Sequence, residues 1–306
     1  MDQLYTELGD RPDLAAIEVN APEGYIADKV MPIVNVVDKT GTIYYATVEA
    51  DAAAQTSRAA GGSVTATQIS DSNTTFTTAE YIKRGAVTPT EVKQMGGIEK
   101  ADMVGAKFAK RQVMGALEEA VAAEVMDGAI DETFDSANAT IQIQVANEAL
   151  RLYEGKTVLV ASTKTLKTMI NQMAGDSVIG PAFVRLVSGS APSVAVQGLG
   201  FDIWLAGLAM YLGVDEVQAG ADTVWGTSAR VARFTVMKQS TDMDPLAHKY
   251  LPIFGKTYMF LPDTVQPYQI ESIPDRILKN NYYDSTIRFD TVALNSAALY
   301  QFDGVV

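Results

Sequence analysis

Residues 41–81 read GTIYYATVEADAAAQTSRAAGGSVTATQISDSNTTFTTAEY, and this stretch decides how the whole chain is interpreted. Its two ends are rich in β-branched and aromatic residues, such as the Tyr44-Tyr45 pair and Phe76, whereas Arg58 and the Gly61-Gly62 pair lie in a small, polar middle. A strand, a glycine-containing tip and a second strand predict a long two-stranded hairpin. An isolated hairpin is only marginally stable in water, so we expect this one to lie across another surface. The alternative is a disordered Thr/Ser-rich linker.

The region before the hairpin, residues 1–40, is predicted to be an arm. Pro12, Pro22 and Pro32 interrupt any long helix, because proline removes a backbone donor and fixes φ. Two short apolar runs, YIADKV at 25–30 and IVNVV at 33–37, are typical of strands. An ordinary edge strand would explain them, but we favour an arm docked on its own subunit and on neighbouring subunits.

The region after the hairpin carries strong helix signals. Thr88-Pro89-Thr90-Glu91 has the spacing of a capping box with proline at the first helical position, and Gly96-Gly97 ends that short helix. A long helix is then predicted over residues 98–127, which are rich in good helix formers. Thirty residues at 1.5 Å each would span roughly 45 Å.

The remaining sequence alternates between helix and strand patterns. Residues 140–154 and 162–173 are predicted helices, and strands are expected at 157–161, 201–205, 224–236, 258–261, 268–273, 286–294 and 298–302. The fold class is therefore α+β. We divide the chain into an arm (1–40), an extended loop (41–82), a helix-rich segment (83–155), an α/β segment (156–270) and returning C-terminal strands (271–306).

Composition narrows the function classes. The 306 residues include 24 basic and 37 acidic ones, a net charge of −13 that opposes tight contact with phosphate backbones. No cysteine is present, which excludes disulfides and thiolate chemistry. No stretch is long and apolar enough for a transmembrane helix, and no secretory signal is visible at the first residues.

Signals of catalysis or ligand binding are weak. His248 is the only histidine, and no Gly-x-Ser-x-Gly elbow accompanies it. Gly198-Leu-Gly200 lacks the third glycine of a dinucleotide fingerprint. The acidic residues between Asp127 and Asp135 do not have calcium-loop spacing. We therefore predict no catalytic residue, no cofactor and no metal.

Four further residues are assigned structural roles. Adjacent residues diverge on a helix, so Glu118-Glu119 is interpreted as a solvated face and not as a catalytic pair. Trp204 and Trp225 have strand-like surroundings, and we expect them to pack in a core or an interface.

The order of the parts resembles a known family. An arm and a polar hairpin suit a subunit that extends into its neighbours, as in a shell. The chain is similar over nearly its whole length to major capsid proteins of tailed bacteriophages with the HK97 fold. YIADKVMPIV at 25–34 resembles the family's N-arm phrase, and 41–82 resembles its E-loop. Residues 83–155, with a spine helix at 98–127, resemble its peripheral domain, and 156–270 its axial domain. The phrase TVWG at 223–226 is also frequent in the family.

The resemblance implies a structural protein without enzymatic activity. Its subunits would assemble into hexamers and pentamers of an icosahedral capsid around double-stranded DNA, in a virion built in the host cytoplasm. Portal, scaffolding and decoration proteins are the implied partners, and no membrane is involved. The implied inter-subunit contacts are Tyr44, Tyr45, Arg58, Gly61, Gly62 and Phe76 in the E-loop, and Tyr25, Ile26 and Pro32 in the N-arm.

One feature of the E-loop departs from part of the family. Some members cross-link an E-loop lysine to a neighbour, but residues 50–80 contain no lysine, and guanidinium is a poor nucleophile. The shell is therefore expected to be non-covalent. An encapsulin-like compartment of the same fold, and an enzyme with an unrecognised site, are the alternative functions.

Overall fold

The computed structural model describes most of the chain. The described residues are 9–10, 12–15, 25–47, 71–153, 155–173, 209–213, 218–219, 222–225, 227–239, 252–261, 268–275, 277 and 280–305. Helices and strands are mixed along the chain, which confirms the α+β class. The predicted strand at 201–205, Trp204 and His248 lie outside these residues.

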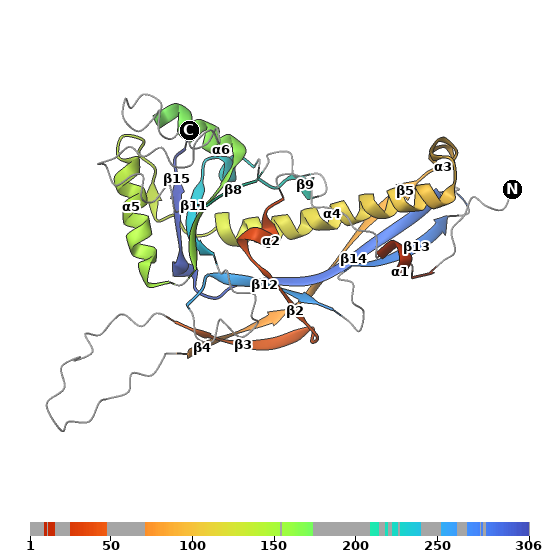
Figure 1. Cartoon of the computed structure of the whole chain (residues 1–306), viewed down its shortest axis with the longest axis horizontal. Helices are drawn as coiled ribbons and strands as arrows, with labels where there is room; N and C mark the ends of the chain where they lie inside the picture. The colour runs from red at the N-terminus through yellow and green to blue at the C-terminus, as the bar shows by residue number, and fades with distance from the viewer. Residues whose placement is uncertain are drawn as a thin grey trace, which may run out of the picture.

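The helical elements alternate with groups of strands along the sequence. They are α1 (Pro12–Ala15), α2 (Ala27–Val30), α3 (Pro89–Met95), α4 (Ile98–Met126), α5 (Ala139–Ala149), η1 (Leu150–Leu152), α6 (Thr163–Met173), α9 (Ser228–Val231) and η3 (Ser296–Ala298). Figure 1 shows α4 as the long element that runs along the molecule, with α3 at one end and the α5–α6 region at the other.

The turn before α4 forms as the sequence predicts. The Thr88 side chain accepts a hydrogen bond from the Glu91 amide, while the Glu91 carboxylate accepts one from the Thr88 amide at 2.7 Å. Gly96 has φ +81°, in the left-handed region, and ends α3. The long helix α4 then begins at Ile98 and ends at Met126, one residue before the predicted end.

The larger sheet lies beside α4. Its described strands follow the order β1 (Gly9–Asp10), β13 (Gln269–Asp275), β14 (Asn280–Ala293), β12 (Gly255–Phe260) and β2 (Ile33–Val36). A further strand, β5 (Ala79–Val87), pairs antiparallel with β14 from Phe289↔Ala79 to Asn281↔Val87. The 14-residue strand β14 is thus the centre of this sheet (Figure 1).

Small residues allow α4 to lie very close to this sheet. A Cβ at Gly105 would lie 2.3 Å from the Tyr283 ring, and one at Gly85 would lie 2.5 Å from the Gly105 carbonyl oxygen. The Tyr283 hydroxyl donates a hydrogen bond to buried Asp102 on the helix. Close packing therefore depends on glycine at two facing positions.

The second sheet lies at the opposite end of α4 from α3. Its order is β6 (Glu132–Thr133), β15 (Leu299–Asp303), β11 (Phe234–Gln239), β7 (Lys156–Ser162) and β8 (Ala209–Gly213). After β7, the Ser162 hydroxyl accepts from the Thr165 amide at 3.0 Å, so Ser162 caps α6 as predicted. A short pair, β9 (Gln218–Ala219) and β10 (Asp222–Thr223), leads towards Trp225.

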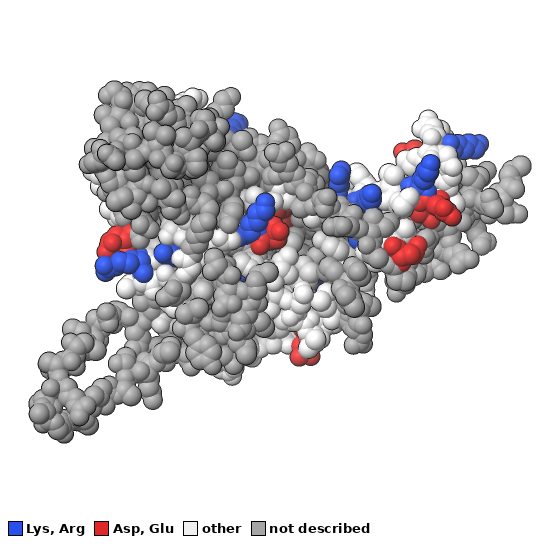
Figure 2. Space-filling model, viewed as in Figure 1, with Lys and Arg blue, Asp and Glu red and all other residues white. Residues whose placement is uncertain are grey.

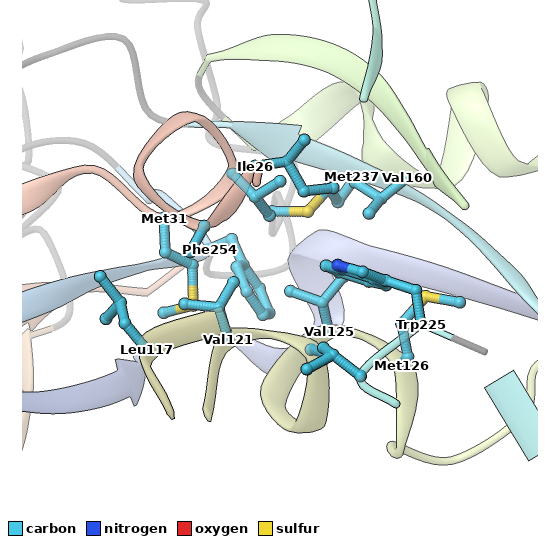
Figure 3. Close-up of a cluster of buried hydrophobic side chains, with 14 of the residues drawn as sticks. Ile26, Met31, Leu117, Val121, Val125, Met126, Val160, Trp225, Met237 and Phe254 are labelled. Atoms are coloured by element: carbon cyan, nitrogen blue, oxygen red, sulfur yellow. The ribbon is translucent and has the colours of Figure 1, made fainter. Parts of the chain in front are cut away.

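The largest apolar cluster joins the two sheets through α4. Figure 3 shows the side chains of the arm, of α4 and of both sheets converging around Trp225 and Phe254. Trp225 is fully buried, which confirms its predicted packing role. The members labelled in the figure are Ile26, Met31, Leu117, Val121, Val125, Met126, Val160, Trp225, Met237 and Phe254.

Two strand predictions are wrong in part. Residues 27–30, within the predicted strand 25–30, form the helical turn α2, although 33–36 do form a strand. Within 224–236, Thr227 caps the short helix α9 and only Phe234 onward is strand β11. In the first place the helical turn brings the Ala27 amide to Glu118 of α4. In the second it brings the Arg230 amide to the Thr227 hydroxyl.

Candidate functional site

The hairpin is the first candidate functional element, and the structure describes its proximal part. Strands β3 (Thr40–Ala46) and β4 (Asp71–Thr77) pair antiparallel, from Thr40↔Thr77 to Ala46↔Asp71. They lie below β12 and β2 in the view of Figure 1. The two limbs are therefore as predicted, while Arg58 and the Gly61-Gly62 pair lie outside the described residues.

The base of the hairpin is attached to its own subunit by aromatic and polar contacts. The Phe76 ring stacks on Tyr258 of β12 with 4.9 Å between centroids and 9° between planes. A Cβ at Gly41 would lie 2.5 Å from the Phe76 ring, so glycine is required across the hairpin from it. The Thr77 amide donates to the Asp290 carboxylate at 2.8 Å. These contacts fix the direction in which the hairpin leaves the body.

The structure separates the predicted contact residues into two groups. Phe76, Ile26 and Pro32 are buried within the chain, and their contact with a neighbour remains a prediction. These three side chains lie against the body of the chain, which removes their apolar surface from water. Tyr44 is 51% exposed, and Tyr25 and Tyr45 are partly exposed, so their contacts remain a prediction.

A buried carboxylate on α4 holds the arm. The Ala27 amide, at the start of α2, donates to Glu118 Oε1 at 2.7 Å, and Trp225 Nε1 donates to Glu118 Oε2 at 3.1 Å. Ile26, the N-cap residue of α2, makes no side-chain capping bond of its own. Glu118 therefore caps a helical turn that lies 91 residues earlier in the chain.

The electrostatics of Glu118 follow from its burial. The side chain is 2% exposed, and no ion pair between described residues involves it. Burial raises the pKa of Glu118 from 4.5 to about 7, and the hydrogen bonds from Ala27 and Trp225 oppose that rise. The interpretation of Glu118 as part of a solvated face is wrong. The group can change its charge near neutral pH while it contacts the arm.

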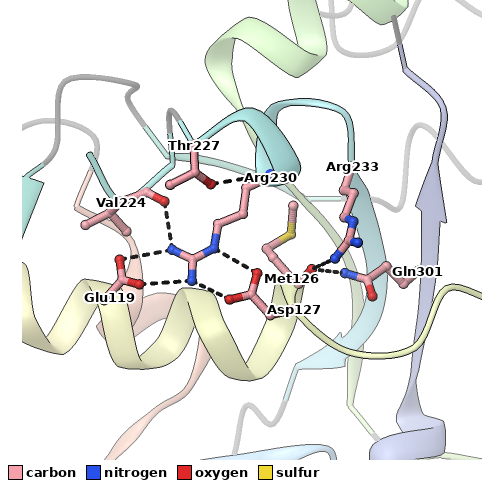
Figure 4. Close-up of polar contacts among 8 residues, drawn as sticks. All are labelled: Glu119, Met126, Asp127, Val224, Thr227, Arg230, Arg233 and Gln301. Carbon is pink, nitrogen blue, oxygen red and sulfur yellow. Dashed lines mark hydrogen bonds and ion pairs between the residues drawn. The ribbon is translucent and has the colours of Figure 1, made fainter. Parts of the chain in front are cut away.

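The neighbouring Glu119 belongs to a second junction, centred on Arg230. Figure 4 shows the Arg230 guanidinium between Glu119 and Asp127 of α4, with hydrogen bonds of 2.6 to 3.0 Å to both carboxylates. It also donates to the Val224 carbonyl at 2.8 Å. Burial acts to lower the pKa of Arg230, but hydrogen bonds to Asp127 and Glu119 outweigh it and raise that pKa above its usual value. This junction fixes the turn that carries Trp225.

A signal for both junctions was present in the sequence. Glu118 lies three and seven residues before Val121 and Val125, on the same buried stripe of α4. Glu119 and Asp127 lie eight residues apart, on one face of the helix. Helical periodicity could therefore have placed Glu118 inside, although not its partners.

Within the described parts of the chain, no group of three or more His, Asp or Glu side chains is placed to hold a metal ion. No described helix has the length and apolarity needed to cross a membrane.

Comparison with solved structures shows the fold. The chain is similar to a phage-related protein from Bordetella bronchiseptica, with a TM-score of 0.63, 17% identity and 98% of each chain covered. It is also similar to the capsid protein of the cyanophage P-SCSP1u, with a TM-score of 0.50, 9% identity, and 94% of this chain and 92% of that one covered. The encapsulin SrpI of Synechococcus elongatus gives a TM-score of 0.50, 9% identity, and coverage of 95% and 93%. No protein-family model and no curated protein sequence matches the chain.

These likenesses confirm the expected fold. The chain has the fold of HK97-type capsid proteins, and the likeness extends over nearly its full length. The helix predicted at residues 98–127 is α4, and the described part of the predicted hairpin is β3 and β4.

Proposed function

We propose that this protein is the major capsid subunit of a tailed bacteriophage, which assembles into hexamers and pentamers of an icosahedral shell. The observation that carries the proposal is the architecture: a hairpin and an arm attached to an α+β body along a 29-residue helix. This architecture is shared with a cyanophage capsid protein over 94% of the chain. The role is structural, without catalysis.

The division of the chain supports this role. We assign residues 83–155, which contain α3 and α4, to the peripheral domain, and residues 156–270, which contain β7, β11 and β12, to the axial domain. Exposed Tyr44 and partly exposed Tyr45 and Tyr25 contact neighbours in the shell, together with Arg58 and the Gly61-Gly62 pair at the hairpin tip. Each contact is modest, but a subunit that makes several at once dissociates only when all of them break.

The proposed contents and partners follow from charge. Double-stranded DNA is enclosed without sequence-specific binding, because a subunit with net charge −13 is poorly suited to hold phosphate tightly. Portal and scaffolding proteins, and decoration proteins where the shell has them, are the remaining partners. Assembly takes place in the host cytoplasm, and the finished protein resides in the virion.

An encapsulin-like compartment is the second candidate. The likeness to SrpI has the same TM-score, 0.50, as the likeness to the cyanophage capsid. Such a shell would enclose a protein cargo instead of a genome.

The first test is electron microscopy of the purified full-length protein at physiological salt, with and without proteins co-expressed from its own gene cluster. Closed shells are expected, and only small particles under both conditions would contradict a shell-forming role. Shells are then treated with nuclease and their contents extracted. Protected double-stranded DNA supports the capsid, whereas a co-purifying enzyme without DNA supports the compartment.

Deleting residues 50–72 tests the role of the hairpin. The base contacts of Phe76 and Gly41 lie outside the deletion, so the subunit should keep its fold and melting temperature within a few degrees. Closed shells should disappear, because the distal hairpin can no longer reach a neighbour. A Val37→Ser variant, with an 82% exposed side chain away from the deleted segment, is the control. Intact shells from the deletion variant would refute the assignment.

Boiling assembled shells in detergent tests the prediction of a non-covalent shell. With no lysine in residues 50–80 and no cysteine, only a band of about the 32.8 kDa subunit mass is expected on electrophoresis. A ladder of higher bands that resists boiling would show that the subunits are covalently joined.

A further inference from the structure

The first half of α4 presents an unusual combination of exposed side chains. Phe108 is 54% exposed, Val104 46% and Met103 41%, although large apolar residues are normally buried when they repeat along a helix. Exposed basic residues lie between them. We name this set of six the α4 ridge: Lys100, Met103, Val104, Lys107, Phe108 and Arg111.

The spacing of the ridge residues gives it a defined shape. Lys100, Lys107 and Arg111 are seven and four residues apart, so they form one line along the helix over about 16 Å. Val104 and Phe108, four residues apart, flank this line on one side, and Met103 flanks it on the other. In Figure 2, Lys and Arg side chains are visible along the stretch occupied by α4 towards α3, with acidic groups beside them.

The cations of the ridge have no ion-pair partners among the described residues. The ion pairs of the described residues involve Arg84, Arg151, Arg230 and Arg288, and none involves Lys100, Lys107 or Arg111. Lys110, by contrast, turns inward and donates to the Ala15 carbonyl at 2.6 Å. The ridge is thus a positive line on the surface of a chain whose net charge is −13.

We propose that the α4 ridge is a docking surface for an acidic amphipathic helix of another protein. Carboxylates on such a helix, spaced by seven and four residues, would face Lys100, Lys107 and Arg111. Apolar side chains on its flanks would cover Val104, Phe108 and Met103, as in other helix–helix recognition. Charge complementarity supplies orientation and association rate, and the apolar flanks supply the area removed from water.

Other occupants fit the ridge less well. Duplex DNA would satisfy the three cations, but a phosphate backbone leaves Phe108 and Val104 in water, and the acidic chain repels it as a whole. A second copy of the chain is the other candidate. It would need an acidic helical face with the same spacing, and the described helices of eight residues or more contain none.

The test uses the full-length chain in dispersed form and a labelled synthetic helix of roughly 18 residues. The helix carries Glu at the matching spacing of seven and four, with Leu on the flanks, and a control peptide replaces Glu by Gln. Binding is followed by fluorescence anisotropy at several salt concentrations. A labelled duplex of roughly 20 base pairs and sedimentation of the protein alone are measured in parallel.

We expect the Glu peptide to bind with a Kd of about 10 µM and the Gln peptide to bind about tenfold more weakly. Lys107→Glu should weaken binding of the Glu peptide about tenfold and reduce its salt dependence. Lys164→Glu, the same charge change at an exposed position on α6, should change it less than about twofold. Phe108→Ser should weaken binding of both peptides about fivefold.

Three results would overturn the proposal. The first is failure of the Glu peptide to bind, or an equal effect of Lys107→Glu and Lys164→Glu. The second is DNA binding that Lys107→Glu abolishes while the peptide does not bind, which would assign the ridge to nucleic acid. The third is self-association lost in Lys107→Glu without peptide binding, which would assign it to a second copy. Shell formation is scored separately by microscopy, so this inference and the proposed function can fail independently.

Discussion

The two halves of α4 differ in how much of the helix surface is buried. Residues 98–112 contact the larger sheet on one side through Gly105 and leave the other side to solvent. Residues 113–126 are buried around most of the helix, by the arm, both sheets and the turn that carries Trp225. The first half has mainly small residues inside, together with buried Asp102 and Lys110, and its other cations lie outside. The second half has apolar residues and one buried carboxylate, Glu118.

The difference shows how one helix can serve as both a packing element and a joint. Where only one face is covered, stability depends on close contact, and the free face is available for partners. Where all faces are covered, buried polar groups must find donors, so Glu118 fixes which segments can lie against the helix. The arm is one of those segments.

The largest loss of stability should come from placing a large side chain between the first half of α4 and the larger sheet. Gly105→Leu places its side chain where the Tyr283 ring already lies, 2.3 Å from the Cβ position. We expect a loss of about 4 kcal/mol in the free energy of unfolding, at the upper end for overpacking. Urea denaturation of the dispersed subunit measures it, with Val104→Ala on the exposed face as the control. A loss no larger than that of Val104→Ala would show that the sheet can move away from the helix.

The second prediction concerns the buried carboxylate of the second half. The pKa of Glu118 is about 7 in the folded chain against 4.5 for a solvated carboxyl, so unfolding releases a proton between these values. The contribution of protonated Glu118 to the free energy of unfolding is complete below pH 4.5 and is lost as the pH rises to 7. The difference corresponds to about 3 kcal/mol. The free energy of unfolding of the wild type minus that of Glu118→Gln should fall by about this amount between pH 4.5 and 7.5.

The control for this measurement is Glu99→Gln, on the exposed surface of the same helix. Urea is the denaturant, because it does not screen charge. If the two difference curves have the same slope, the pH dependence does not come from Glu118. Hydrogen exchange of the Ala27 amide should follow the same pH dependence as the Glu118 contribution, because Glu118 accepts its hydrogen bond.

The smallest effect should come from the Arg230 junction. Arg230→Ala leaves Glu119 and Asp127 without their cation, but their side chains are 42% and 45% exposed and can be hydrated. We therefore expect a loss of about 2 kcal/mol, less than for a fully buried ion pair. Thermal unfolding compares it with Arg233→Ala, which removes a hydrogen bond to the Met126 carbonyl alone. Equal shifts in Tm would mean that the two carboxylates contribute nothing to the junction.

Local signals predicted the parts of the fold that are held by local interactions. The capping box from Thr88 to Glu91 and the end of α3 at Gly96 involve residues a few positions apart, so the sequence pattern alone is sufficient. The same holds for the length of α4, since its composition favours helix throughout. The Ser162 cap of α6 is a further example.

Tertiary contacts determine the parts of the fold that local sequence signals did not predict. Residues 25–30 have a strand-like pattern, but Glu118 stabilises the first turn of α2 from far along the chain. The Phe76 ring stacks on Tyr258, 182 positions later in the sequence, and no local pattern indicates that pair. These contacts join residues that are far apart in the sequence. A single sequence does not show which distant segments lie side by side in the folded chain.

The position of β14 in the chain has a consequence for synthesis. Its residues, Asn280–Ala293, pair with β5, β12 and β13, so the sheet beneath α4 lacks its central strand until the last part of the chain is made. At bacterial translation rates, roughly ten to thirty seconds separate the emergence of α4 from that of β14. During that time β5 can contact α4, but β14, the partner of β5 in this sheet, is absent. A ribosome-bound chain therefore cannot complete this sheet until nearly all of its residues have been made.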